Sequence, residues 1–247
     1  MFNRLLNKLN YRIIKRCSSS SSSAQFLAVK LSNRKIIRVC GIDSIIYLQS
    51  LITNDVRHLL PFENITKKTS LYAYMLNANG KVLCDLFLYR GKIISEGELL
   101  MEIDSCLAKA MKRLLWGHCI RRKISIEIGD DVSIWSLIPK SEEHELINEI
   151  VSDDISIVQD PRIPQMGYRI ITRLGSTFDD IKRYINVPID QGTLGQFQKY
   201  RYQLGVHEGV DDIPSAFHHP FECNGDYLNA VSISKGKLYF LRKFFLN

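Results

Sequence analysis

Histidine and cysteine side chains in this sequence form two groups that have the chemistry of metal ligands. The first is the stretch HHPFEC, which contains His218, His219 and Cys223, and the second is the pair His118 and Cys119. Imidazole nitrogens and thiolates bind zinc, usually through four ligands at short, repeated spacings. Neither group has further ligands at such a spacing, so we expect no stable metal site. The six cysteines include no CxxC pair and are expected to be free thiols.

A polar loop near the end of the chain is a second candidate for chemistry. Residues 205–229 read GVHEGVDDIPSAFHHPFECNGDYLN and are rich in Gly, Pro and Asp. Loops of this composition often carry binding residues, but they also serve as plain connectors. The composition of the loop leaves both interpretations open.

The elements that would position such a loop are predicted from hydrophobic periodicity. Residues 71–91 read as two strands joined at Asn79 and Gly80, a dipeptide that tolerates the positive φ angles of a tight hairpin. Strands and helices alternate elsewhere, without the long apolar runs or the Gly-rich phosphate loop of a parallel nucleotide-binding sheet. The predicted fold class is therefore α+β with mostly antiparallel strands. The other predicted strands cover 35–41, 98–104, 123–129, 132–138 and 167–174, and the predicted helices cover 44–52, 105–117, 142–151, 177–185 and 194–205.

The charge of the chain is distributed unevenly. The net charge is +7, from 33 Lys and Arg against 26 Asp and Glu. The first acidic residue is Asp43, and nine of the basic residues precede it, which leaves 24 basic and 26 acidic residues beyond that point. A nucleic-acid groove needs clustered positive charge on the folded part, so we expect no nucleic-acid partner.

The basic excess belongs to the first 25 residues, which read MFNRLLNKLNYRIIKRCSSSSSSAQ. Arg4, Lys8 and Arg12 recur at helical spacing beside a leucine-rich face, and a serine run follows. This composition is typical of a mitochondrial transit peptide that is removed on import into the matrix. A disordered tail and a membrane-surface helix are the alternatives. No apolar run reaches the length of a bilayer-spanning helix, so we expect no membrane partner.

Five stretches of this sequence resemble, in the same order, those of the mitochondrial transferase-like iron–sulfur cluster assembly factors. That family is related to the T-protein of the glycine cleavage system, a tetrahydrofolate-dependent aminomethyltransferase. The resemblance extends over residues 31–236. The stretches are LQSLITNDV, YAYMLNANGKVLCDLFLYR, DPRIPQMGYRI, YRYQLGVHEGVDDIP and VSISKG.

The resemblance implies an aminomethyltransferase-like, folate-binding body over residues 26–236 and a C-terminal β-barrel after it. In the family the last stretch continues as K-G-C, an aromatic residue and then G-Q-E. Here Lys237 stands where the cysteine is expected, and residues 237–247 read as a tail from outside the family. We therefore expect this form to lack the C-terminal β-barrel domain and to be impaired in function. A thiolate at that position would supply a soft ligand for iron, which the lysine does not.

Residue types at two positions argue against the enzyme activity of the related transferases. The resemblance places Cys84 and Asp85 where the aminomethyltransferases carry two Asp residues, and it places Arg169 where they carry a Glu. A thiol titrates well above a carboxylic acid, so Cys84 cannot supply a second fixed negative charge near neutral pH. We therefore expect no enzyme activity in methylene transfer. A working folate-dependent aminomethyltransferase is the alternative, and a scaffold without folate or cluster roles is the third hypothesis.

Seven residues are predicted to contact tetrahydrofolate or to order the loop beside it, and none is predicted to be catalytic or to bind a metal. The aspartates among them are expected to accept hydrogen bonds from the pterin, and the arginine and the lysine to meet the glutamate tail. The glutamates are expected to order the loop. For each residue the structural alternative is a loop cap or a surface salt bridge. The seven are Asn54, Asp55, Asp85, Arg169, Glu208, Glu222 and Lys235.

The function that the resemblance implies is assistance in the maturation of [4Fe–4S] proteins in the mitochondrial matrix. Its implied partners are A-type iron–sulfur carrier proteins and the [4Fe–4S] client enzymes that receive the clusters. Tetrahydrofolate is the implied cofactor.

Overall fold

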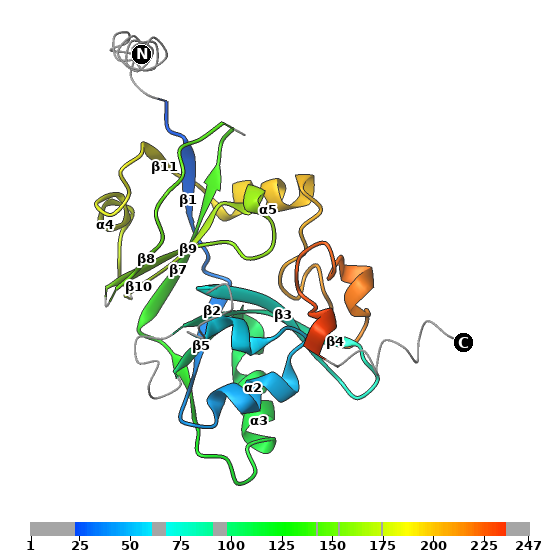
Figure 1. The fold of residues 1–247 in the computed structure, drawn as a ribbon. Coiled ribbons are helices and arrows are strands. Elements are labelled where there is room, and N and C mark those ends of the chain that lie inside the picture. The colour runs from blue at the N-terminus through cyan, green and yellow to red at the C-terminus, as the bar shows by residue number, and fades with distance from the viewer. Residues whose placement is uncertain are drawn as a thin grey trace, which may run out of the picture.

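Two β-sheets pack against each other in the computed structural model of the chain (Figure 1). The structure describes residues 23–60, 68–90, 98–141, 143–152, 154–173 and 175–235. Residues 1–22 of the predicted leader and the tail at 237–247 lie outside the described residues. Almost all strand pairs are antiparallel, with β1 and β11 as a parallel pair. This arrangement confirms the predicted α+β class.

The five-stranded sheet is built around the hairpin that Asn79 and Gly80 predict. Its order is β3-β4-β5-β2-β6. In the turn the Asn77 side chain accepts hydrogen bonds from the backbone N–H groups of Asn79 and Lys81, and Gly80 adopts a φ of 77°. The hairpin prediction is confirmed. The strands are β2 (Arg34–Cys40), β3 (Ser70–Leu76), β4 (Val82–Arg90), β5 (Leu99–Asp104) and β6 (Ser125–Gly129).

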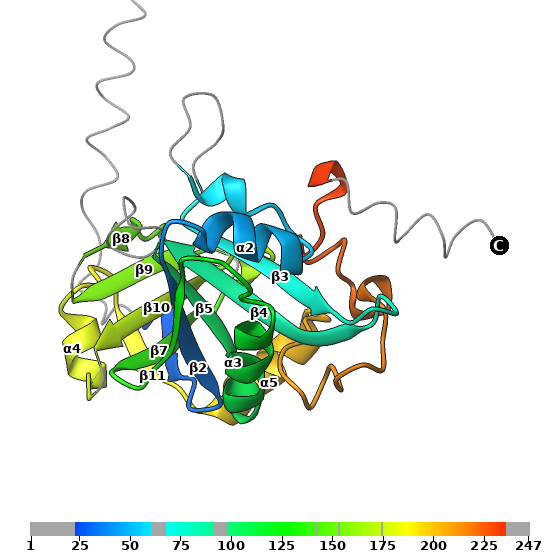
Figure 2. The same cartoon turned by 90° about the horizontal axis from the view of Figure 1, so that it is seen from below.

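Two helices, α2 (Ser44–Leu51) and α3 (Ala108–Gly117), cover the outer face of this sheet (Figure 2). The apolar spacing in α3 buries Met111 and Leu115 against the strands. Asp43 precedes α2 but makes no side-chain cap. Its carboxylate instead accepts a hydrogen bond from the backbone N–H of Lys123, which ties the start of α2 to the loop after α3.

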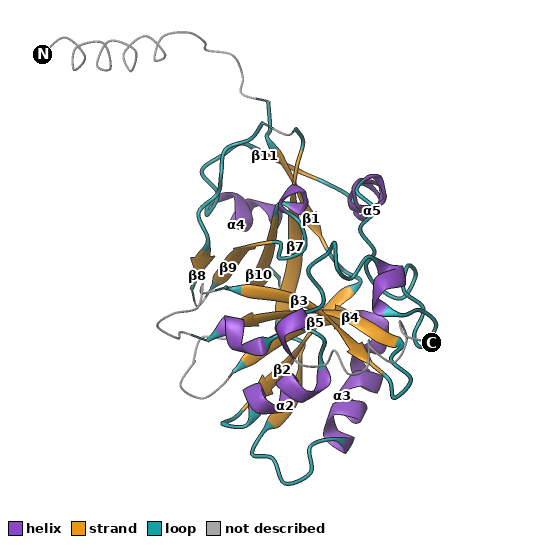
Figure 3. Cartoon of the chain, turned by 45° about the vertical axis from the view of Figure 1, so that its right-hand side comes forward, coloured by secondary structure: helices purple, strands orange, loops and turns teal. Residues whose placement is uncertain are grey.

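The six-stranded sheet forms the other layer and has the order β11-β1-β7-β10-β9-β8 (Figure 3). Its apolar residues make two cores, one shared with the five-stranded sheet and one beneath α4. No described helix is long and apolar enough to cross a membrane. The strands are β1 (Phe26–Lys30), β7 (Val132–Pro139), β8 (Ile150–Val151), β9 (Ile155–Gln159), β10 (Tyr168–Arg173) and β11 (Ile189–Gln191), and the helices beside them are α4 (Phe178–Lys182) and α5 (Leu194–Gln203).

The predicted helix at 142–151 is wrong, and the segment instead makes hydrogen bonds with other parts of the chain. Residues 144–149 have no regular structure, and β8 follows them. The backbone N–H of Ile147 donates to the hydroxyl of Tyr168. The carboxylate of Glu149 accepts from the backbone N–H of Gln159 and from the Thr69 hydroxyl. Contacts with distant strands therefore override the local helical pattern.

Gly167 starts β10 from a backbone conformation that other residues rarely adopt. Its φ is 70° and its ψ is −119°, and an added Cβ would lie 2.2 Å from the carbonyl oxygen of Leu137. We predict that Gly167→Ala lowers the free energy of unfolding by about 3 kcal/mol or more, because dihedral strain and a backbone clash add. Gly175→Ala is the matched control, since Gly175 has a φ of 88° but open space around its Cβ position. That variant should lose only about 1 kcal/mol. Urea unfolding of both variants measures the difference, and equal losses would contradict the steric argument.

Candidate functional site

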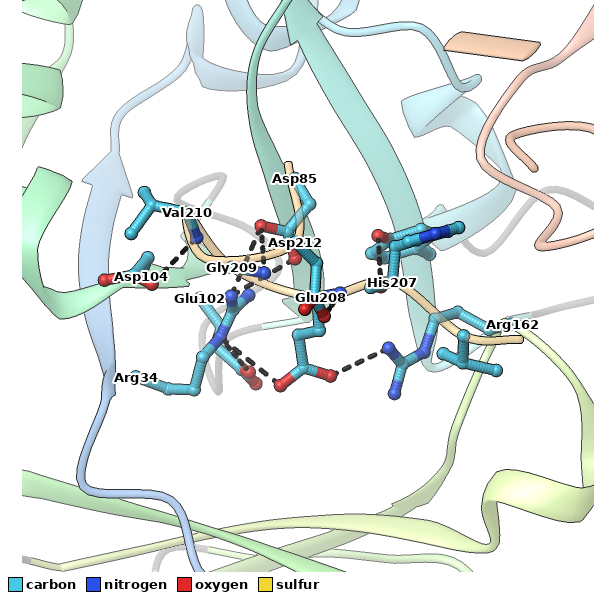
Figure 4. A network of polar contacts seen from close by, with 12 residues as sticks. Arg34, Asp85, Glu102, Asp104, Arg162, His207, Glu208, Gly209, Val210 and Asp212 are labelled. Carbon is cyan, nitrogen blue, oxygen red and sulfur yellow. Dashed lines mark hydrogen bonds and ion pairs between the residues drawn. The ribbon is translucent and has the colours of Figure 1, made fainter. Parts of the chain in front are cut away.

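A group of fully buried charged side chains lies where the two sheets meet. We call it the ionic cluster; it contains three guanidinium groups and four carboxyl groups. Each of its side chains is almost completely shielded from solvent, and Figure 4 shows most of them in close contact. The members are Arg34, Asp85, Glu102, Asp160, Arg162, Arg169 and Glu208.

The five-stranded sheet contributes three members of the cluster. Arg34 opens β2, and its Nε donates to Oε1 of Glu102 on β5 at 2.9 Å. Its Nη1 reaches Oδ2 of Asp85 on β4 at 3.1 Å. The antiparallel order β4-β5-β2 brings these three positions side by side although they are distant in sequence.

The six-stranded sheet contributes its cations from β10 and from the loop after β9. Arg169 on β10 crosses to the other sheet, where its Nη1 lies 2.8 Å from Oε1 of Glu102. Its Nε donates to Oδ2 of Asp160 at 3.1 Å. Arg162 also binds Asp160, with its Nη2 at 2.8 Å from Oδ2. Glu102 and Asp160 therefore hold Arg169 from opposite sheets.

Glu208 brings the polar loop at 205–229 into the same cluster. Its Oε2 accepts from Nη1 of Arg162 at 2.7 Å and also from Nη2 of Arg169. The next residue in the loop, Gly209, donates its backbone N–H to Oδ1 of Asp85 at 3.1 Å. The loop is therefore more than a plain connector, because it supplies a charged member of the cluster.

One aromatic ring lies against the cations of the cluster. The guanidinium carbon of Arg169 is 4.2 Å from the centroid of the Phe87 ring, and that of Arg162 is 4.9 Å from the same centroid. Contacts of this kind favour a desolvated cation. The hydroxyl of Tyr89 donates to Oε2 of Glu102 at 2.6 Å, which satisfies the second oxygen of that carboxylate.

Charge interactions decide the ionisation state of the buried acids. Burial alone would raise the pKa of Glu208, but the facing guanidinium groups of Arg169 and Arg162 outweigh that effect and hold its pKa far below the usual range. Burial also opposes ionisation of Asp160, whose pKa is nevertheless lowered by the same two arginines. Both acids are therefore anionic at neutral pH.

Two polar atoms inside the cluster lack hydrogen-bond partners among the described residues. They are Nη2 of Arg34, a donor, and Oε1 of Glu208, an acceptor. Oε1 of Glu208 lies 4.0 Å from Nε of Arg34, so the two groups are close to each other. Buried polar atoms are normally satisfied, and such a pair is therefore suited to a bound polar group or a water molecule.

A second group of contacts fixes the end of the described chain, and we call it the C-terminal clasp. The Thr53 hydroxyl donates to the carbonyl oxygen of Ala230 at 2.6 Å, and the Asn54 side-chain amide donates to that of Asn229 at 2.7 Å. The Lys235 ammonium group donates to the carbonyl oxygen of Asn54. The residues Thr53 and Asn54 thus position the segment that carries Lys235.

The seven predicted site residues fall into four places. Asp85, Arg169 and Glu208 come together in the ionic cluster, and Asn54 and Lys235 come together in the clasp. The other two, Asp55 and Glu222, are not brought to the cluster. Sequence reasoning missed Arg34, Glu102, Asp160 and Arg162; the last two lie in the quoted stretch DPRIPQMGYRI, which is the signal that could have identified them.

Asp55 and Glu222 both make local contacts. The carboxylate of Asp55 accepts from the Arg57 side chain and from Gln49, and the contact with Arg57 lowers its pKa to about 2. Glu222 is exposed and accepts from the backbone N–H of His219 in a short turn. These arrangements match the structural alternatives of a loop cap and a surface contact.

A cavity borders the ionic cluster on the side of Asp160 and Arg162. This cavity of about 400 Å³ is lined by residues that include Ser70, Asp160, Arg162 and Asn229, so it borders both the ionic cluster and the clasp. A larger open cavity of about 1090 Å³ lies at another edge of the two sheets, beside Arg38 and other residues. Within the described ranges, no three His, Cys, Asp or Glu residues are grouped in a way that could hold a metal ion.

Comparison with known proteins identifies clear relatives. No family model matches the chain. It is 32% identical over 227 residues to the mouse protein named iron–sulfur cluster assembly factor IBA57, mitochondrial, and 30% identical over 223 residues to the human protein of that name. The matches cover 89% and 87% of this chain, and 62% and 61% of the relatives, so the chain spans less than two thirds of their length.

The fold is that of a solved aminomethyltransferase. The crystal structure of glycine cleavage system aminomethyltransferase T from Bartonella henselae superposes with a TM-score of 0.67. The sequence identity is 16%, and the match covers 90% of this chain and 64% of that protein. The prediction of an aminomethyltransferase-like body is confirmed at the level of the fold.

Loss of the Glu208 charge should be strongly destabilising, because two buried arginines share one of its oxygens. We predict that Glu208→Gln lowers the free energy of unfolding at neutral pH by about 3–5 kcal/mol. Because the folded pKa of Glu208 is lowered, its contribution is complete above its unfolded pKa of about 4 and is lost as the pH falls toward the folded pKa. The variant should therefore lose less stability than the unaltered chain on acidification.

Glu222→Gln is the matched control for this substitution, because Glu222 is exposed and makes its contacts within one turn. Its unfolding midpoint in guanidinium chloride should stay close to that of the unaltered chain. If Glu208→Gln and Glu222→Gln had the same unfolding midpoint at neutral pH and again at acidic pH, the role assigned to Glu208 would be contradicted.

Proposed function

We propose that this chain, a homologue of the mitochondrial iron–sulfur cluster assembly factors named IBA57, assists the maturation of [4Fe–4S] proteins in the mitochondrial matrix. The proposed partners are A-type iron–sulfur carriers, which would deliver clusters, and the client enzymes that receive them. The basic, acid-free leader supports the proposed location.

The observation that carries the choice of an assembly role over enzyme activity is the state of Arg169. Its guanidinium is fixed by carboxylates of Glu102, Asp160 and Glu208. Arg169 thus places a permanently charged cation at a position where the related transferases are expected to carry a carboxylate. The thiol of Cys84 is buried in the core beneath α2 and α3, and burial raises its pKa well above the usual range. Neither group can act as the second negative charge that methylene transfer would use.

The chemistry of the ionic cluster supports tetrahydrofolate as the ligand of the same region. A pterin presents ring N–H and amino donors beside ring-nitrogen and carbonyl acceptors. Oε1 of Glu208 and Nη2 of Arg34 are a buried acceptor and a buried donor without hydrogen-bond partners among the described residues. We assign pterin binding to Asp85 and Glu208, with Arg169 holding Glu208 in place. Tetrahydrofolate would supply a one-carbon carrier there.

The residues of the clasp have a second role in this proposal. Asn54 and Lys235 hold the segment that leads to residue 237. Asp55 stabilises the loop after α2 by accepting a hydrogen bond from the Arg57 side chain, and Glu222 stabilises its turn by accepting one from the backbone N–H of His219. Lys235 is also the remaining candidate for contact with the glutamate tail of folate, because Arg169 is buried and its partners are carboxylates.

Rescue of cells that lack their own assembly factor tests the proposed function. We expect the unaltered chain to restore little aconitase activity and the Lys237→Cys variant to restore more, because a thiolate can bind iron and an ammonium group cannot. Lys199→Cys is the control, since Lys199 is an exposed lysine on α5 far along the chain from this segment. The proposal would be contradicted if both the unaltered chain and Lys237→Cys were soluble in the matrix but gave no more aconitase activity than an empty vector.

An assay of the purified chain distinguishes the assembly role from the transferase alternative. Purified chain is mixed with tetrahydrofolate and an aminomethyl donor protein, and methylene-tetrahydrofolate is measured. We expect no product above the level without the chain. Catalytic turnover would overturn the assembly role in favour of an aminomethyltransferase.

A further inference from the structure

Large apolar side chains are exposed at the end of α3 and at the start of α2, the two helices that cover the outer face of the five-stranded sheet. Four large apolar side chains project into solvent there. The exposed fractions are 69% for Ile42, 59% for Ile46, 62% for Trp116 and 76% for Ile120. We call this surface, together with residues 109–123, the α3 tip.

Two contacts bring the segments of the α3 tip together. The hydroxyl of Tyr47 on α2 donates to the carbonyl oxygen of Leu115 on α3 at 2.5 Å. The carboxylate of Asp43 accepts from the backbone N–H of Lys123 at 2.8 Å. The start of α2 and the end of α3 are therefore neighbours, as Figure 2 shows from below. Their exposed apolar residues lie at the same end of the molecule.

The α3 tip is also strongly basic. No acidic residue occurs between Asp104 and Glu127. Six basic residues lie in that interval, and in the part of the chain that the structure describes none of them forms an ion pair. They are Lys109, Lys112, Arg113, Arg121, Arg122 and Lys123.

The combination of features indicates what the α3 tip binds. Surfaces that contact anionic lipids typically combine exposed apolar side chains, often including a Trp, with a cluster of about four to eight Lys and Arg residues. The apolar side chains enter the headgroup region, and the basic side chains bind the phosphates. We propose that the α3 tip binds the surface of an anionic phospholipid membrane.

Two other partners fit the surface less well. A nucleic acid would use the basic side chains but would leave the four apolar ones exposed to water. The α3 tip projects from the body at the lower end of Figure 1. An acidic protein partner would therefore need a groove into which this projection fits. The expectation of no membrane partner rested on the length of apolar runs, which concerns spanning and not surface contact.

Fluorescence of Trp116 tests this proposal in the full chain. The other tryptophan, Trp135, is buried, so a shift on addition of vesicles reports Trp116. We expect a blue shift with vesicles of phosphatidylcholine and cardiolipin, a much smaller one with phosphatidylcholine alone, and none in Trp116→Phe. The shift should reverse when the salt concentration rises, because exposed charges are screened.

Vesicle co-sedimentation of variants tests the charge contribution. We expect the triple variant Arg121→Gln, Arg122→Gln, Lys123→Gln to partition at least about tenfold less into the anionic vesicles. The control neutralises Lys182, Arg183 and Lys199, which are exposed elsewhere, and should bind like the unaltered chain. The basic leader is common to all of these proteins, so the difference between them reports the α3 tip.

The outcomes that overturn the proposal are clear-cut. Anionic vesicles that sediment the chain without shifting Trp116 emission would place binding elsewhere, and equal loss in the triple variant and its control would show a general charge effect. Absence of binding to anionic vesicles would also overturn it. Binding of an oligonucleotide that the triple variant alone abolishes would assign the surface to nucleic acid. The substituted side chains are exposed, and circular dichroism checks that each variant is folded.

Discussion

The fold depends on the ion pair between Arg169 and Glu102, because it joins the two sheets in a region shielded from solvent. Moving a guanidinium and a carboxylate into such a region is unfavourable unless each finds several partners in good geometry. Arg169 meets Glu102, Asp160 and Glu208, while Glu102 also meets Arg34 and Tyr89. Each charge is therefore stabilised only while both sheets and the loop at 205–229 are in place.

This constraint also shapes the candidate site. A cluster that needs every member leaves little freedom for the loop that carries Glu208, and the clasp at Thr53 and Asn54 fixes the far end of the same segment. Nη2 of Arg34 and Oε1 of Glu208 thus lie among fixed groups and have hydrogen-bonding capacity that the described residues do not use. Groups that are already oriented lose little freedom when they bind a polar ligand.

Predictions from the sequence were correct for features encoded by adjacent residues, and they failed where contacts with other parts of the chain determine the structure. The hairpin at Asn79 and Gly80 is encoded in a few adjacent residues, and the apolar spacing of α3 is equally local. The helix expected at 142–151 was wrong because Tyr168 and Gln159, which lie on later strands, bind a backbone N–H group and a side chain of this segment.

The candidate site shows the same division. Asp85 and Glu208 were identified by resemblance and not by spacing, and nothing local shows that Arg34 or Glu102 would meet them. Burial of a charged residue such as Arg34 is invisible in a sequence, since its neighbours on β2 resemble those of any half-buried strand.

A double-mutant cycle between Glu102 and Arg169 measures whether this ion pair joins the sheets. The free energy of unfolding is measured for the unaltered chain, for Glu102→Gln, for Arg169→Gln and for the chain with both changes. We predict that each single change costs about 3–5 kcal/mol and that the double change costs at least about 1 kcal/mol less than the two losses added. Losses that add within about 0.5 kcal/mol would show that the two residues act independently, and the pair could not be what joins the sheets.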